Sequence, residues 1–210
     1  MNIPIDRRAL PGSIVLGALT ISFFIFLKPL SLVSLFVFCF HLSFFRNPRR
    51  IPPPGEFPVS PADGTVVAID TVQENRFLNS EVYKIGIFLS IFNAHVNRSP
   101  ISGEICYWNY QKGKFLNALQ SDSAEFNECL WLGIEGAKRK ILVRLIAGAI
   151  ARRICCEVSK GDQLQRGVKI GIICYGSRAE VYIPKNNFRL SVKIGDKVKA
   201  GLTILGEWIQ

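Results

Sequence analysis

The sequence predicts a mainly β protein: a β-sandwich or barrel-like domain that follows an N-terminal hydrophobic helical hairpin. Residues 9–45 are strongly apolar, whereas the chain from Val59 onward consists of short apolar runs separated by glycine turns. Many short strands with regular turns are typical of sandwiches and barrels. A chain of 210 residues has room for one such domain and an appendage.

The apolar region consists of two runs, 9–27 and 30–45, interrupted by Lys28-Pro29. A membrane helix needs about 20 apolar residues, which the first run reaches and the second slightly misses. Arginines flank the region on both sides, at positions 7, 8, 46, 49 and 50. Because positive flanks stay on the cytoplasmic side, two short helices in a hairpin fit better than one span. Residues 1–45 are therefore predicted to anchor the chain. A cleaved signal peptide fits poorly, since the apolar region is too long and no small-residue cleavage site follows.

Residues 46–58, RNPRRIPPPGEFP, are predicted to be a stiff linker, because a proline cluster excludes helix and central strand. The catalytic β domain is expected to occupy residues 59–210. A short helix is expected at 115–124. The predicted strands are 64–70, 82–89, 102–109, 129–135, 140–147, 153–158, 168–175, 179–183, 189–193 and 202–207.

A weak internal repeat supports the β prediction. Residues 158–173 resemble residues 192–207, and Gly161-Asp162 aligns with Gly195-Asp196. Each unit reads as strand, Gly-Asp turn, strand, glycine, strand. Such units are similar to the half-repeats of biotinyl/lipoyl-type β-sandwiches.

Charge and cysteine content limit the partners and the compartment. Lys plus Arg is 26 against 16 for Asp plus Glu, a net charge of +10, which fits an anionic partner. The hydrophobic N-terminal region favours a membrane surface over nucleic acid. Six cysteines lack any C-x-x-C pair, so neither a metal site nor a disulfide framework is expected. A reducing, cytoplasmic setting follows for the β domain.

Three residues suggest nucleophilic chemistry. Asp63 lies in SPADGTVVAI, His95 is the only histidine of the β domain, and Ser177 lies in GIICYGSRAEVYIP. Asp, His and Ser can form a triad in which histidine takes the hydroxyl proton. No G-x-S-x-G elbow surrounds Ser177, which instead interrupts a strand-like run. Its hydroxyl could attack the carbonyl of Gly176, because glycine adopts the strained backbone that this attack needs. A membrane-anchored serine hydrolase with an intact chain stays open.

Five segments, taken together and in this order, resemble the short form of the phosphatidylserine decarboxylase family. They are PADG (61–64), FNAHVNRSP (92–100), FNE (126–128), IAGAIARRI (146–154) and YGSR (175–178). The resemblance covers residues 59–207, and the hydrophobic N-terminal region fits it too. The chain departs from the family at Cys174-Tyr175 and Cys129, where relatives tend to carry Arg-Phe and Arg.

The resemblance implies an inactive proenzyme that cuts itself between Gly176 and Ser177, with Asp63, His95 and Ser177 as the triad. A β chain of residues 1–176 and an α chain of residues 177–210 would result. Ser177 would become a pyruvoyl cofactor that forms a Schiff base with the substrate amine, and His95 would protonate the product carbon. No metal is expected. The substrate would be phosphatidylserine in the cytoplasmic membrane, and the product phosphatidylethanolamine.

Four arginines are candidates for contacts with the lipid phosphate or carboxylate, because a guanidinium fork suits such acceptors. They are Arg98, Arg152, Arg153 and Arg178. Two further alternatives stay open. One is a decarboxylase of a related serine-linked lipid. The other is a lipoyl-like carrier, although no lysine stands in a recognisable hairpin-tip setting.

Overall fold

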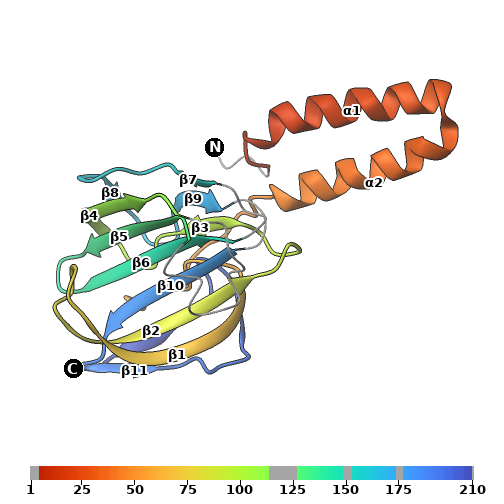
Figure 1. Ribbon diagram of the computed structural model, residues 1–210. Helices are drawn as coiled ribbons and strands as arrows, with labels where there is room; N and C mark the ends of the chain where they lie inside the picture. The colour runs from red at the N-terminus through yellow and green to blue at the C-terminus, as the bar shows by residue number, and fades with distance from the viewer. Residues whose placement is uncertain (1–4, 114–126, 149–152, 174–176, 210) are drawn as a thin grey trace. The chain divides into compact units, whose positions relative to one another are not determined.

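The computed structural model describes residues 5–113, 127–148, 153–173 and 177–209, in two compact units that divide between Arg49 and Arg50 (Figure 1). The first unit is a pair of helices, α1 (Ala9–Phe26) and α2 (Lys28–Phe44). Pro29 lies in the first turn of α2, where its missing N–H costs nothing. The helices are joined by a 2.8 Å hydrogen bond between Thr20 Oγ1 and Ser34 Oγ. The expected helical hairpin is therefore present.

Helix α1 is long and apolar enough to cross a membrane, whereas α2 is shorter. Nearly all of α1 is exposed within the structure, including Ile14, Phe24 and Phe26. Apart from its contact with α2, this long apolar helix is mostly uncovered within the described structure and has the length and composition of a membrane span.

The second unit is built on an eight-stranded antiparallel sheet in the order β12-β1-β2-β10-β6-β5-β4-β8. The sheet curls, and two small sheets, β11-β13 and β3-β9-β7, complete the unit (Figure 1). The mainly β prediction is confirmed. The strands are β1 (Gly64–Glu74), β2 (Ser80–Leu89), β3 (Val96–Arg98), β4 (Gly103–Gln111), β5 (Cys129–Glu135), β6 (Lys140–Ala147), β7 (Ile154–Cys156), β8 (Gln163–Leu164), β9 (Lys169–Ile173), β10 (Ser177–Pro184), β11 (Phe188–Leu190), β12 (Lys197–Val198) and β13 (Gly206–Trp208).

Alternation along the central strands separates two cores. On β10, Ala179, Val181 and Ile183 face the larger core, and the residues between them face the smaller one. Each fully buried aliphatic side chain contributes about 1.5–3 kcal/mol, so the larger core stabilises the unit most. Ser177 shares the parity of Ala179 and therefore lies on the side of the larger core.

The sheet is internally duplicated. Strands β12-β1-β2-β10 match β8-β4-β5-β6 in mirrored order about the centre of the sheet. The β1–β2 ladder has an irregularity between Val66 and Ala68, and the β4–β5 ladder has one between Ile105 and Tyr107. Equivalent bulges at equivalent positions mark two copies of one unit related by a pseudo-twofold axis. The second copy, β4 to β9, lies in the chain between β2 and β10.

The predicted repeat consists of two matching turns. Gly161 and Gly195 have φ values of +94° and +95°, a conformation that favours glycine. Gly161 donates its N–H to the Ile105 carbonyl at 2.9 Å, and Gly195 donates to the Val66 carbonyl at 2.8 Å. Each turn thus docks on the first long strand of its own copy, β4 for Gly161 and β1 for Gly195. The likeness to biotinyl/lipoyl domains stays a prediction, and the helix expected at 115–124 lies outside the described residues.

Residues 50–58, which we call the strap, lie along the β unit. Arg166 donates from Nη1 to the Phe57 carbonyl at 2.8 Å and from Nη2 to the Pro53 carbonyl. The Pro58 carbonyl accepts the Leu205 N–H at 2.9 Å. The prolines exclude helix, as the sequence predicts, and these contacts dock this part of the linker on the β unit.

Candidate active site

Several strands terminate at the same end of the sheet. Ser177, the first residue of β10, lies opposite Leu89 at the end of β2 and opposite Ala147 at the end of β6. Gly64 opens β1 beside the same end of β2, where an added Cβ would lie 2.2 Å from the Phe88 carbonyl oxygen. Only glycine allows this close approach, which places the preceding residue, Asp63, at the end of the sheet that carries Ser177.

Ser177 is fully buried, and its Oγ has no hydrogen-bond partner among the described residues. Buried hydroxyls are nearly always paired, so one that is not needs an explanation. A nucleophile held for attack is such an explanation. The sequence placed Ser177 within a strand-like run, and the structure places it at the start of β10, after β9 has ended at Ile173. Gly176 lies outside the described residues.

His95 lies just before β3 and is fully buried. Its Nδ1 is 3.0 Å from the Asn93 carbonyl oxygen. Because a carbonyl can only accept, this contact assigns the proton to Nδ1 and makes Nε2 the basic nitrogen. The His95 carbonyl accepts the Ile173 N–H at 3.3 Å. Ser177 follows Ile173 by four residues, so the Cα atoms of Ile173 and Ser177 are at most about 15 Å apart.

Asp63 precedes Gly64 and is bound on both carboxylate oxygens. Arg50 donates from Nη1 to Oδ1 and from Nη2 to Oδ2, the latter at 2.6 Å. The Ala200 N–H also donates to Oδ1, at 2.8 Å. The structure thus places Asp63 and Ser177 at the same end of the large sheet and bonds the backbone of His95 to the end of β9, and the action of the three as a triad stays a prediction.

Two of the four candidate arginines have partners inside the β unit. Arg98 is buried and donates from Nη1 to the Gly167 carbonyl at 2.9 Å. Burial lowers the pKa of Arg98, and nearby Arg50 lowers it further while Asp63 opposes the change. Arg178 alternates with Ser177 and so points to the opposite face of the sheet.

Arg178 belongs to a buried charge cluster on that opposite face. Glu180 Oε1 lies 3.0 Å from Arg178 Nε and 3.8 Å from Lys84 Nζ, and Glu180 Oε2 lies 3.5 Å from Arg144 Nη1. Tyr182 donates its hydroxyl to Glu180 at 2.7 Å. Burial and the neighbouring Glu180 raise the pKa of Tyr182. Burial, the largest single influence, lowers the pKa of Arg144, but Glu180, Cys129 and Tyr182 together outweigh it and the net shift is upward.

The other two candidates, Arg152 and Arg153, belong to the segment of the sequence between β6 and β7. Arg153 is exposed, and Arg152 lies outside the described residues. Glu128 ties down both flanks of this segment. Its carbonyl accepts the Ala147 N–H at 2.9 Å, and its Oε1 accepts the Ile154 N–H at 3.1 Å. The sequence offered only a family motif for Glu128, without a role.

Arg50 is a site residue that the sequence did not nominate. A cluster of arginines beside a hydrophobic segment predicts contact with lipid head groups, and no local pattern separates Arg50 from Arg49. The two differ in the structure, because Arg49 is exposed whereas the side chain of Arg50 is only 8% exposed. Only the fold brings residue 50 to residue 63.

Metal and disulfide chemistry find no support in the described part of the chain. There, no group of three or more His, Cys, Asp or Glu side chains could hold a metal ion. The five cysteines placed in the structure are free: Cys39, Cys106, Cys129, Cys155 and Cys156.

Known proteins are similar in sequence to this chain over nearly its whole length. The chain is 42% identical to the phosphatidylserine decarboxylase proenzyme of Carboxydothermus hydrogenoformans, over 92% of this chain and 91% of that protein. It is 43% identical to the proenzyme of Geotalea uraniireducens over 98% and 97%, and 46% identical to that of Geobacter metallireducens over 91% and 86%. The family model for phosphatidylserine decarboxylase matches residues 37–206. The chain therefore belongs to the phosphatidylserine decarboxylase family.

Proposed function

We propose that this chain is a self-processing, pyruvoyl-dependent decarboxylase that converts phosphatidylserine to phosphatidylethanolamine and CO₂. One observation carries the proposal: the buried Ser177 hydroxyl has no hydrogen-bond partner in the described structure, at the same end of the sheet as Asp63. Family membership supports it, since the named relatives are phosphatidylserine decarboxylase proenzymes.

Self-processing uses groups that the fold holds in place. The Ser177 hydroxyl attacks the carbonyl carbon of Gly176, so that the peptide C–N bond breaks, the freed amine takes up a proton and a backbone ester forms. β-Elimination of this ester then cuts the chain and releases the Gly176 carboxylate, and hydrolysis of the dehydroalanine left at position 177 releases ammonia and gives the pyruvoyl group. His95 Nε2 is the base that takes the hydroxyl proton, because the Asn93 contact keeps the other proton on Nδ1. Asp63 stabilises the imidazolium that forms. Strand β10 pairs with both β2 and β6, so Ser177 keeps its position while the bond before it breaks.

Decarboxylation needs an electron sink at the substrate amine, which the pyruvoyl group made from Ser177 supplies. His95 then donates a proton to the carbon that has lost CO₂. We assign the phosphate or carboxylate of the lipid to Arg152 and Arg153. Arg98 and Arg178, which the sequence also suggests, are only 4% and 3% exposed and bind groups of the β unit itself.

The same proposal gives the location. Helix α1 anchors the chain in the cytoplasmic membrane, with the β unit on the cytoplasmic side, where head groups of anionic lipid are available. The α chain, residues 177–210, stays bound to the β chain because β10 is a central strand of the sheet.

A denaturing gel and a lipid assay test the proposal together. Purified protein should run as two pieces, and mass spectrometry of the small one should show a blocked, keto-bearing N-terminus at position 177. Vesicles containing phosphatidylserine should accumulate phosphatidylethanolamine. Ser177→Ala should give one uncut, inactive chain. A single intact band from an active preparation would instead indicate a serine hydrolase. If only another serine-linked lipid is decarboxylated, that lipid is the substrate in place of phosphatidylserine.

A further inference from the structure

The pair formed by Arg50 and Asp63 is unusually complete for two charged side chains. Both side chains are about nine-tenths buried, with 8% and 10% exposed. The two terminal nitrogens of Arg50 reach one carboxylate oxygen each, and Nη1 also donates to the Ala200 carbonyl at 2.7 Å. Such a fork fixes the plane of a carboxylate as well as its distance.

The internal duplication provides a control for this site within the same molecule. The segment SPADG at 60–64 corresponds to SPISG at 99–103, and Ser102 takes the place of Asp63. Gly201 donates its N–H to the Ser60 carbonyl at 2.8 Å, as Gly167 does to the Ser99 carbonyl at 2.8 Å. The two turns are therefore equivalent in their hydrogen bonds as well as in sequence.

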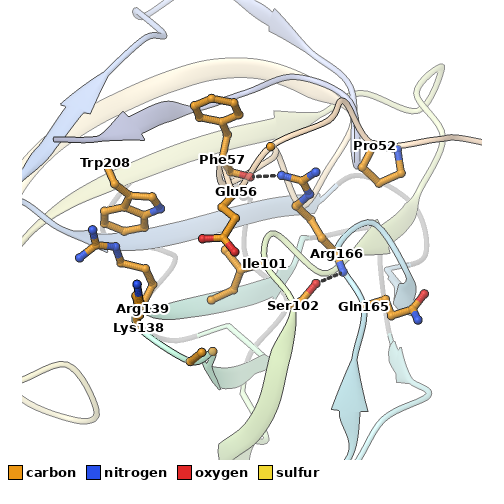
Figure 2. A pocket seen from close by; sticks show the side chains of 13 residues that line it. Pro52, Glu56, Phe57, Ile101, Ser102, Lys138, Arg139, Gln165, Arg166 and Trp208 are labelled. Atoms are coloured by element: carbon orange, nitrogen blue, oxygen red, sulfur yellow. Dashed lines mark hydrogen bonds between the residues drawn. The ribbon is translucent and has the colours of Figure 1, made fainter. Parts of the chain in front are cut away.

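Each turn needs one short acceptor at this position. The Ala200 N–H donates to Asp63 Oδ1 at 2.8 Å, and the Arg166 N–H donates to Ser102 Oγ at 2.9 Å. Figure 2 shows the second arrangement at the rim of a pocket of about 650 Å³, with Arg166 also bonded to Phe57 of the strap. Because serine suffices there, the second oxygen and the charge of Asp63 exceed what the turn requires.

A buried charge is costly unless it is paired and hydrogen-bonded. Arg50 supplies the pairing for Asp63. Among the described contacts, Oδ1 accepts from Arg50 and Ala200 and is saturated, whereas Oδ2 accepts only from Arg50. The Nδ1–H of His95 is already donated to Asn93, so the role left for the Asp63 carboxylate is to stabilise, by its charge, the imidazolium that forms when Nε2 takes a proton.

We propose that Arg50 is a positioning residue for self-processing. It orients the Asp63 carboxylate so that its negative charge stabilises the imidazolium that forms on His95. This role rests on the proposed self-cutting by Ser177. It links the strap to the chemistry, because Arg50 is the first residue of the strap. A carboxylate without its fork would rotate, and a misplacement of about 1 Å at a reacting group can cost about 100-fold in rate.

The test measures the rate of self-cutting of full-length proenzyme by gel, starting from newly synthesised chains. Arg50→Ala should cut about 100-fold more slowly than the wild type, and Arg50→Lys should fall between them because lysine keeps the charge but not the fork. Millimolar guanidinium should restore part of the rate of Arg50→Ala and none of that of Ser177→Ala. Restoration by a small cation reports on the carboxylate, which a general loss of stability would not do.

Two arginines serve as matched controls. Arg49→Ala removes an exposed neighbouring charge, and Arg166→Ala releases the strap from Pro53 and Phe57 without touching Asp63. Both should cut within about twofold of the wild type, the scatter expected of surface changes. Thermal melting of every variant, made also in a Ser177→Ala background, separates folding from cutting. If Arg50→Ala does not fold, the rate of self-cutting is compared between the wild type and Arg50→Lys, provided that Arg50→Lys has an unchanged melting temperature.

The proposal is overturned if Arg50→Ala or a folded Arg50→Lys cuts like the wild type. It is also overturned if Arg166→Ala is as slow as Arg50→Ala, since docking of the strap would then explain the effect. An absence of restoration by guanidinium counts against it as well. A wild-type chain that is never cut would remove the self-processing function itself, an outcome distinct from all of these.

Discussion

At the scale of single residues, the proposed nucleophile and the proposed carboxylate of the site differ in how they are hydrogen-bonded. Ser177 Oγ has no hydrogen-bond partner among the described residues, whereas the Asp63 carboxylate is held by Arg50 and Ala200. Each arrangement suits its proposed role, since a nucleophile must be available and an orienting carboxylate must not move. Ser102 shows the same backbone position without the charge.

The duplication suggests a double variant that removes the charges and keeps the turn. Arg50→Ala alone leaves the Asp63 carboxylate buried and unpaired, and adding Asp63→Ser copies the Ser102 turn. In a Ser177→Ala background, the double variant should regain about 1–3 kcal/mol of the free energy of unfolding that Arg50→Ala loses. Denaturant titration measures this difference.

The same double variant with Ser177 intact should remain uncut on a gel, because it has a stable turn and no carboxylate. Ser102→Ala in the other copy is the control, and it should lose about 1 kcal/mol while cutting normally. Normal cutting by the double variant would remove Asp63 from the triad.

At the scale of elements, β10 carries two functions on its two faces. Ser177 begins the face that packs on the larger core, and Glu180 binds Arg144, Arg178 and Lys84 on the other. The ladders to β2 and β6 hold both faces in register. Arg178 therefore acts as an internal anchor for the strand whose first residue is the proposed new chain end.

Glu180→Gln should destabilise the uncut Ser177→Ala chain by about 3–5 kcal/mol, because it leaves buried cations without their carboxylate. Glu135→Gln is the matched control. Glu135 pairs with Lys140 at 2.9 Å, but these side chains are 40% and 48% exposed, so its loss should cost less than about 1 kcal/mol. Chemical denaturation of the two variants compares them directly. Equal losses would show that the Glu180 cluster adds nothing beyond a surface ion pair.

At the scale of the whole molecule, the chain divides into a helical unit and a β unit. Every strand of the eight-stranded sheet, the strap and all three proposed triad residues belong to the β unit. Helix α1 supplies the apolar length that a membrane anchor needs. The proposed anchor and the proposed catalytic residues therefore lie in separate parts of the chain.

A chain that begins at Arg50 should fold, cut itself and remain in solution, because no strand of the sheet is lost. Sedimentation with phosphatidylserine vesicles should recover the full-length protein in the pellet and leave the shortened one in the supernatant. The gel of the shortened protein should still show two pieces. A shortened chain that folds but stays uncut would show that the helical unit takes part in processing.

The sequence by itself determined the features that depend on local pattern. Apolar length predicted the hairpin, short runs between glycine turns predicted the β unit, and the Gly161 and Gly195 turns appeared as a repeat. Ser177 was found because glycine and a hydroxyl interrupt an apolar run. Each of these signals lies in one continuous stretch of sequence, or in two stretches that can be compared directly, where strand, turn and helix preferences act.

Only the tertiary structure decided which distant residues meet. Arg50 looks like any arginine after a hydrophobic segment until the strap brings it to Asp63. Arg178 looked like a substrate contact, but the pairing of β10 with β2 and β6 buries it in a cluster with Lys84 and Arg144 around Glu180, on the face opposite Ser177. The equivalence of Ser102 and Asp63 follows from the pairing of edge strands. Such meetings depend on long-range strand register and burial, and no short window of sequence contains them.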